Sequence, residues 1–130
     1  MNYFADSDYV IDYLNGRDQA VQLLKSVSAV LSISTITYGE VMEGILYEER
    51  GEERLEALDW FLQDTSMVPV DRAVAERWAR LSADLRIART PLPDADLLIA
   101  ATAIVHGAVL MTRNRKHFER VPNLTLIDHE

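Results

Sequence analysis

Acidic side chains stand at three points of this sequence where an apolar run is followed by the start of an expected helix. Asp6 follows residues 3–5, Glu40 lies beyond residues 30–34, and Asp96 comes soon after a pair of prolines. Carboxylates held a few ångströms apart repel one another unless they are protonated or share a cation. With only oxygen donors present, Mg²⁺ or Mn²⁺ is the natural occupant, and two such ions can flank a phosphodiester roughly 4 Å apart. These residues therefore predict metal-dependent phosphodiester hydrolysis.

Each carboxylate also has an ordinary structural explanation. Acidic residues gather in the first turn of helices because they cap free backbone N–H groups and interact favourably with the helix dipole. The candidates for these roles are Asp6 or Asp8 as an N-cap, Thr37 with Glu40 as a capping box, and Asp94 or Asp96 at a helix dipole. Taken one at a time, these residues favour the structural explanation.

The spacing of apolar residues predicts helices that alternate with short buried strands. The expected strands are residues 3–5, 30–34, 67–70, 109–112 and 124–127. The expected helices are residues 8–15, 17–27, 37–47, a segment after 51 through 62, 73–88, 91–106 and 115–118. This alternation predicts a parallel sheet with helices on both faces.

The predicted sheet brings the acidic residues to a common edge. In an open parallel sheet the carboxyl ends of the strands share one edge, and ligands bind at that edge. With right-handed crossovers, Asp6, Glu40 and Asp96 reach a common crevice, where Thr112 and Asn114 arrive after a further strand. The topology therefore favours a single site over unrelated helix caps.

Composition sets the class of protein. The chain has 130 residues and no cysteine, which excludes disulfides and thiolate metal sites and predicts a single domain, residues 1–130. Net charge is −8, but residues 1–71 carry 14 acidic and 4 basic side chains, whereas residues 72–130 carry 7 acidic and 9 basic ones. The second half can therefore meet phosphate locally. No export signal or membrane span is expected, which favours the cytoplasm.

Four segments carry a resemblance to a known family. They are residues 3–7 (YFADS), 34–40 (STITYGE), 96–103 (DLLIAATA) and 110–114 (LMTRN). In order and spacing they resemble PIN-domain proteins, specifically VapC-type toxins, over nearly the whole chain. The resemblance implies an α/β fold with three layers, α/β/α, around a mostly parallel sheet of four to five strands.

The resemblance also implies roles for individual residues. Asp6, Glu40 and Asp96 match the family's acidic positions and would be both catalytic residues and metal ligands. Residue 114 is acidic in many members but is Asn114 here, which leaves open whether one or two ions bind. The supporting positions are Ser7, where threonine is usual, Asp8, where asparagine is common, Thr112 and Asn114. Asp8 is expected to be either an outer carboxylate or a helix cap.

By resemblance, the chain is an endoribonuclease toxin of a type II toxin–antitoxin system that uses Mg²⁺ (or Mn²⁺). Its partners would be a cognate VapB-like DNA-binding antitoxin and an RNA substrate such as transfer or ribosomal RNA. The candidate RNA contacts are Arg86, Arg89, Arg113 and Arg115, with ordinary solvated surface as the alternative. His117 is left outside the predicted site, in a structural role beside Phe118.

Apolar residues around two adjacent expected helices exceed what one core face needs, so they predict a homodimer and a groove for the antitoxin, with core packing as the alternative. They are Leu46, Tyr47, Leu55, Leu58, Phe61 and Leu62.

Three other functions are compatible with parts of the sequence. Asp6-Ser7-Asp8 after a strand also resembles the nucleophile loop of haloacid-dehalogenase-type phosphatases, with Asp6 as nucleophile. That family needs a lysine before its late acidic pair, whereas Lys116 follows Asp96. A non-catalytic receiver-like domain needs an aspartate after a mid-chain strand, where this chain has an acidic helical stretch. A PIN fold kept only for binding would not need Asp6, Glu40 and Asp96 together.

Overall fold

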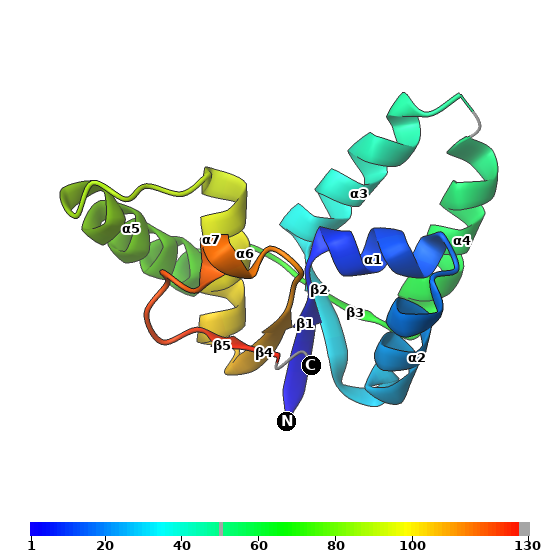
Figure 1. Ribbon diagram of the computed structural model, residues 1–130, viewed down its shortest axis with the longest axis horizontal. Helices are drawn as coiled ribbons and strands as arrows, with labels where there is room; N and C mark the ends of the chain where they lie inside the picture. The colour runs from blue at the N-terminus through cyan, green and yellow to red at the C-terminus, as the bar shows by residue number, and fades with distance from the viewer. Residues whose placement is uncertain (50, 128–130) are drawn as a thin grey trace.

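A parallel sheet runs through the centre of the protein (Figure 1). The computed structural model describes residues 1–49 and 51–127, and within these ranges the strand order is β3-β2-β1-β4-β5, with every pairing parallel. The strands are β1 (Asn2–Ala5), β2 (Leu31–Ser34), β3 (Ser66–Val68), β4 (Ala108–Met111) and β5 (Thr125–Leu126). Each agrees with its predicted position to within two residues at either end.

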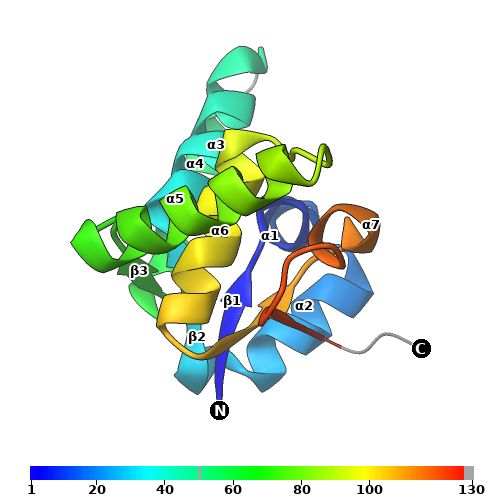
Figure 2. The same ribbon diagram turned by 90° about the vertical axis from the view of Figure 1, so that its left-hand side faces the viewer.

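Helices cover both faces of this sheet (Figures 1 and 2). The helices on one face are α1 (Ser7–Leu14), α2 (Asp18–Ser26), α3 (Thr35–Tyr47) and α4 (Gly51–Gln63). Those on the other face are α5 (Arg72–Ile87), α6 (Asp94–Val105) and α7 (Arg115–Phe118). A short 3₁₀ turn, Ser28–Val30, precedes β2. The predicted three-layer α/β/α architecture is confirmed.

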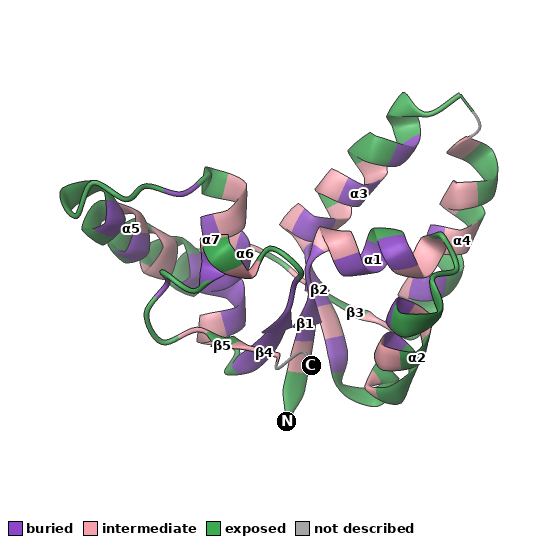
Figure 3. Ribbon diagram, viewed as in Figure 1, coloured by how far each residue is buried: buried purple, intermediate pink, exposed green. Residues whose placement is uncertain are grey.

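Successive residues of the central strands pack into two separate hydrophobic cores, one on each face of the sheet. Phe4 and Leu110 point into the cluster beneath α5 and α6, whereas Ala5 and Met111 point into the cluster beneath α1 and α3. Side chains alternate between the two faces of a strand, so a sheet covered on both faces needs apolar residues throughout. β4 is accordingly buried along its whole length (Figure 3). The central strands are thus fixed in register by packing from both sides.

The helix that carries Glu40 begins earlier than predicted. Ser34 caps α3 by accepting a hydrogen bond from the backbone N–H of Ile36 (3.0 Å), so Thr37 lies inside the first turns and is fully buried. The predicted start at Thr37 is wrong, and so is the capping-box interpretation of Thr37 with Glu40. Glu40 therefore needs another explanation. The helix predicted to begin at residue 91 instead begins at Asp94, with Pro93 as its N-cap.

The order of the strands marks one place for a site. From β1 the chain builds outward through β2 to β3, then returns to the other side of β1 with β4 and β5. The order therefore reverses between β1 and β4, where Ala5 is paired with Met111. Ligands of open parallel sheets bind beyond the carboxyl ends of the strands at such a switch point. Asp6 and Thr112 are the residues that directly follow these two strands.

None of the described helices combines the length and the apolar character needed to span a membrane.

Candidate active site

Asp6 connects the ends of β1 and β4. Its backbone N–H donates to the carbonyl of Met111 (2.9 Å), which continues the pairing of the two strands. One carboxylate oxygen, Oδ1, accepts from the backbone N–H of Ser7 and caps α1 (2.8 Å). The other, Oδ2, accepts from the Thr112 hydroxyl (2.8 Å). Asp6 is only 5% exposed, so it is both the predicted helix cap and a buried acid at the switch point.

Asp8 joins α1 to the loop that follows β4. Its Oδ2 accepts a hydrogen bond from the backbone N–H of Arg113 (2.9 Å) and lies 3.4 Å from the Thr112 hydroxyl. The same hydroxyl accepts from the backbone N–H of Asn114 (3.0 Å). Asp6, not Asp8, is the N-cap of α1, and the charge of Asp8 acts on Asp6.

Glu40 reaches the same edge from α3. A hydrogen bond joins it to the Ser7 side chain, and it interacts electrostatically with Asp96 and Asp8. Within the described residues its buried Oε1 has no hydrogen-bond partner. Glu40 is therefore a half-buried acid for which the protein supplies fewer hydrogen bonds than its carboxylate can accept.

Asp96 approaches from the first turn of α6, and its carboxylate is held by a histidine. Asp96 Oδ2 lies 3.0 Å from His117 Nδ1 on α7, and the same nitrogen lies 2.9 Å from Asn114 Nδ2. Donation to Asp96 requires the proton to be on Nδ1. His117, left outside the predicted site, thus contacts one of its acids. It lies three residues after Asn114, and that helical spacing is the sequence signal that would have revealed it.

The cluster raises the pKa of its own acids. Burial, followed by the charge of Asp8, raises the pKa of Asp6 to about 7, although hydrogen bonds from Thr112 and Ser7 oppose the shift. Burial also raises the pKa of Asp8 and that of Glu40, and the charges of Asp96 and Glu43 add to the effect at Glu40. The charge of Arg113 offsets part of the shift at Asp8, and a bound cation would offset the remaining repulsion within the cluster.

The donors present suit a hard divalent cation. Within the described part of the chain, two buried carboxylate oxygens, Asp8 Oδ1 and Glu40 Oε1, have no hydrogen-bond partner. Carboxylate oxygens are the preferred ligands of Mg²⁺ and Mn²⁺. As residues 1–49 and 51–127 stand, however, no three acidic or imidazole side chains lie close enough to hold an ion together. The Asp96 carboxylate contacts His117 in this arrangement.

A second buried acid, missed by the sequence argument, anchors the loop after β4. Asp12 is buried on α1 and forms ion pairs with Arg113 (3.0 Å) and Arg17 (3.3 Å). Asp12 follows Asp8 by four residues and so shares its helix face. Arg113 is therefore held twice on α1, by its backbone at Asp8 and by its side chain at Asp12. The loop that presents Thr112 depends on both contacts.

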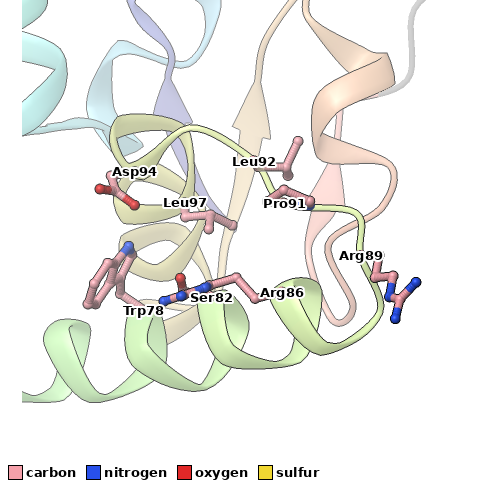
Figure 4. Close-up of a pocket in the computed structure, with 8 residues that line it drawn as sticks. All are labelled: Trp78, Ser82, Arg86, Arg89, Pro91, Leu92, Asp94 and Leu97. Atoms are coloured by element: carbon pink, nitrogen blue, oxygen red, sulfur yellow. The ribbon is translucent and has the colours of Figure 1, made fainter.

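The predicted RNA contacts divide into two pairs. Arg113 is paired with Asp12, and Arg115 donates to the carbonyl of Ile127 and lies 3.8 Å from Glu119. Arg86 and Arg89 instead line a pocket between α5 and α6 (Figure 4). The structure thus gives the first pair internal partners and leaves the second beside an open cavity.

Comparison with known proteins assigns this arrangement to a family. The sequence profile of the PIN domain matches residues 3–124, a span that includes all the acids described above. The chain belongs to the PIN-domain family. This PIN domain is 31% identical over 122 residues to ribonuclease VapC19 of Mycobacterium tuberculosis (strain CDC 1551 / Oshkosh), covering 92% of this chain and 94% of that relative. It is 28% identical over 130 residues to ribonuclease VapC2 of Rickettsia felis, covering 97% and 96%.

The fold agrees with a solved VapC structure. The crystal structure of VapBC2 from Rickettsia felis bound to a promoter DNA fragment superposes with a TM-score of 0.92 at 26% identity, covering 100% of both chains. This PIN domain therefore belongs with the VapC proteins, as its motifs predicted. The same membership decides against the phosphatase and receiver alternatives.

The ion pair at Asp12 can be tested by Asp12→Asn. We expect the variant to lose about 1–2 kcal/mol of unfolding free energy, because Asp12 is buried while its arginine partners remain partly hydrated. Amide hydrogen exchange at residues 112–114 should become faster. The control is Glu76→Gln, which breaks the exposed pair with Arg72 and should change neither quantity appreciably. Unchanged exchange at residues 112–114 in Asp12→Asn would show that this loop does not need the anchor.

The raised pKa of Asp6 predicts an unusual pH dependence of metal-free stability. Because the folded pKa of about 7 exceeds the ordinary 3.8, this group's contribution is fully present below pH 4 and is lost as the pH rises through 7. Asp6→Asn keeps a helix cap but cannot ionise. In a chelator it should therefore be more stable than the wild type above pH 7, by the order of a few kcal/mol, with no gain near pH 4. Denaturant titrations of both proteins across this range would refute the prediction if the difference did not vary with pH.

Proposed function

We propose that this PIN domain is a Mg²⁺- or Mn²⁺-dependent endoribonuclease and the toxin of a type II toxin–antitoxin system. The observation that carries the proposal is the meeting of Asp6, Asp8 and Glu40 at the switch point, with raised pKa values and two unpartnered carboxylate oxygens. Family membership supports the reaction, because the VapC relatives are named ribonucleases. Asp6, Glu40 and Asp96 are the proposed catalytic residues and metal ligands.

A divalent cation bound by these carboxylates would activate water and stabilise the charge that develops on a phosphodiester. Asp6, Glu40 and Asp96 would hold this cation. The Thr112 hydroxyl fixes one carboxylate oxygen of Asp6, and Asp96 would exchange its contact with His117 for the cation. Ser7 and Thr112 are committed to hydrogen bonds with the acids, so no protein nucleophile is needed. The products would carry 5′ phosphate and 3′ hydroxyl ends.

The supporting residues position the proposed metal ligands and are not themselves proposed as ligands. Asp8 adds negative charge behind Asp6 and holds the loop through Arg113, while Ser7 orients Glu40. Asn114, at a position that is acidic in many VapC-type toxins, contacts His117 rather than the other acids. A second ion would therefore be held more weakly than the first.

We further propose that the partners are a VapB-like antitoxin and an RNA such as transfer or ribosomal RNA, and that the protein acts in the cytoplasm. The solved relative from Rickettsia felis is a VapBC2 assembly on promoter DNA, which supports such an antitoxin. A homodimer also remains a proposal. Of the apolar residues predicted to mediate it, Leu58 and Phe61 belong to the core, whereas Leu46 is 69% and Tyr47 is 92% exposed. The end of α3 is therefore the surface that could take a partner.

A matched pair on one helix tests the assignment of Glu40. Glu40→Gln removes a proposed ligand, whereas Glu43→Gln changes an exposed acid three residues later in α3. We expect Glu40→Gln, like Asp96→Asn, to reduce cleavage of a single-stranded RNA in Mg²⁺ by at least about a hundredfold, and Glu43→Gln to stay near the wild type. Mapping of the RNA ends gives the measurement, and circular dichroism checks the fold. Wild-type cleavage by Glu40→Gln or by Asp96→Asn would mean that this acid has only a structural role.

A further inference from the structure

A pocket of about 600 Å³ lies between α5 and α6 (Figure 4). Trp78 and Arg86 line it from α5, Arg89 from the residues after that helix, and Asp94 and Leu97 from α6. Figure 4 shows Trp78 and Asp94 at one end and Arg89 at the other, with Arg86 reaching along the floor between them. The pocket is thus an elongated groove with an aromatic ring and an acid at one end and cations along the rest.

The groove and the carboxylate site share the first turn of α6. Asp94 lines the groove and Asp96 belongs to the site, and because they stand two residues apart their side chains point to different sides of the helix. A nucleotide strand whose phosphodiester lies at Asp96 would reach the groove by passing around this helix end.

Trp78 has a donor that the described residues leave unpaired at this end of the groove, and the protein itself buries the nitrogen. Within the described residues its buried Nε1 has no hydrogen-bond partner, and Figure 4 shows the ring nitrogen on the edge that faces Asp94. Buried polar groups are normally hydrogen-bonded, so an unpaired indole N–H beside a pocket points to a partner that comes from outside. An N–H donor next to a carboxylate acceptor matches the edge of a nucleobase, where donors and acceptors adjoin, and the indole face can stack on a base.

Arg89 occupies a backbone position that normally favours glycine. Its φ is +61°, and it follows α5 in a turn where the N–H of Thr90 donates to Leu85 O (2.8 Å) and that of Arg89 to Arg86 O (3.1 Å). Glycine is the usual residue at this point of a helix end. Arg89 is thus a second exposed arginine on this groove, and Figure 4 shows its guanidinium at the opposite end from that of Arg86, which reaches toward Ser82 and Trp78. Two guanidinium groups spaced along one groove suit successive phosphates of a nucleic-acid strand.

We propose that the groove between α5 and α6 is a nucleotide subsite that binds the single-stranded RNA flanking the scissile bond, with Trp78 and Asp94 taking a base and Arg86 and Arg89 the adjoining phosphates. The inference rests on the proposed ribonuclease function. A peptide of the antitoxin is the competing occupant. The combination of an aromatic ring, a facing donor and acceptor, and two cations favours RNA, since a nucleotide offers a base and phosphates within one unit.

Three substitutions test the subsite without disturbing the acids. Arg86→Ala removes one cation, Arg89→Gly removes the other while supplying the residue that best fits its backbone, and Trp78→Phe keeps a stacking face without the N–H. Arg80→Ala, an exposed arginine of α5 outside the groove, is the control. The thermal midpoint of Arg89→Gly should hold or rise, so any loss of RNA binding cannot be attributed to unfolding.

Two measurements use the same mixed-sequence single-stranded RNA. The first is binding of the fluorescently labelled RNA in a chelator, where cleavage is absent. We expect Trp78→Phe to weaken binding about fivefold, the equivalent of one hydrogen bond, and each arginine variant to lower the slope of log affinity against log salt by about 0.7. The second is cleavage in Mg²⁺ of the RNA shortened from either end. Wild-type kcat/KM should fall when the nucleotide on one side is removed, and the arginine variants should be insensitive to that removal.

The outcomes separate the subsite from the proposed function. Groove variants that bind RNA with the affinity and salt slope of the wild type overturn the subsite, even if Asp96→Asn abolishes cleavage. Loss of antitoxin affinity with unchanged RNA affinity also overturns it and identifies a peptide groove. RNA binding that weakens in the groove variants but not in Arg80→Ala supports the subsite. If the wild type then binds RNA without cleaving any, the proposed function fails and the subsite stands.

Discussion

The burial of several carboxylates beside one another is the constraint on which the rest of this structure depends. Asp6, Asp8 and Glu40 come from α1 and α3 and meet where the strand order reverses, and burial raises the pKa of each. A folded protein does not keep such a cluster for stability, because replacing the charge would relieve both repulsion and desolvation. The proposed divalent cation would explain the cluster, and the proposed metal-dependent chemistry would follow from it.

The fold offsets part of this repulsion with rigid neutral donors. Asp6 receives a backbone N–H and the Thr112 hydroxyl, and Asp8 receives the N–H of Arg113. Behind them Asp12 holds the Arg113 side chain, so the loop after β4 is pinned to α1 from two directions. The acids are thus pre-positioned on elements packed into both cores. Asp96 is held instead by the imidazole of His117.

The sequence predicted the layers, the strands and the three principal acids, because apolar periodicity and the shared edge of a parallel sheet depend on short-range pattern and general topology. It missed what depends on the orientation of individual side chains. The start of α3 was misplaced because Thr37 with Glu40 imitates a capping box, whereas packing buries Thr37 and leaves the cap to Ser34. The roles of Asp12 and of the groove at Trp78 arise from contacts across elements, which spacing along the chain does not encode.

The central claim is that Asp6, Glu40 and Asp96 bind a divalent cation that replaces a proton on the buried cluster. Calorimetric titration of the metal-free protein with Mn²⁺, in buffers that differ in ionisation enthalpy, counts the protons released on binding. The pKa of Asp6 is about 7. We therefore expect Mn²⁺ binding to release protons when the buffer pH lies about one unit below this pKa, and almost none when the buffer pH lies well above it. Binding without proton release at the lower pH, or no binding at either pH, would contradict it.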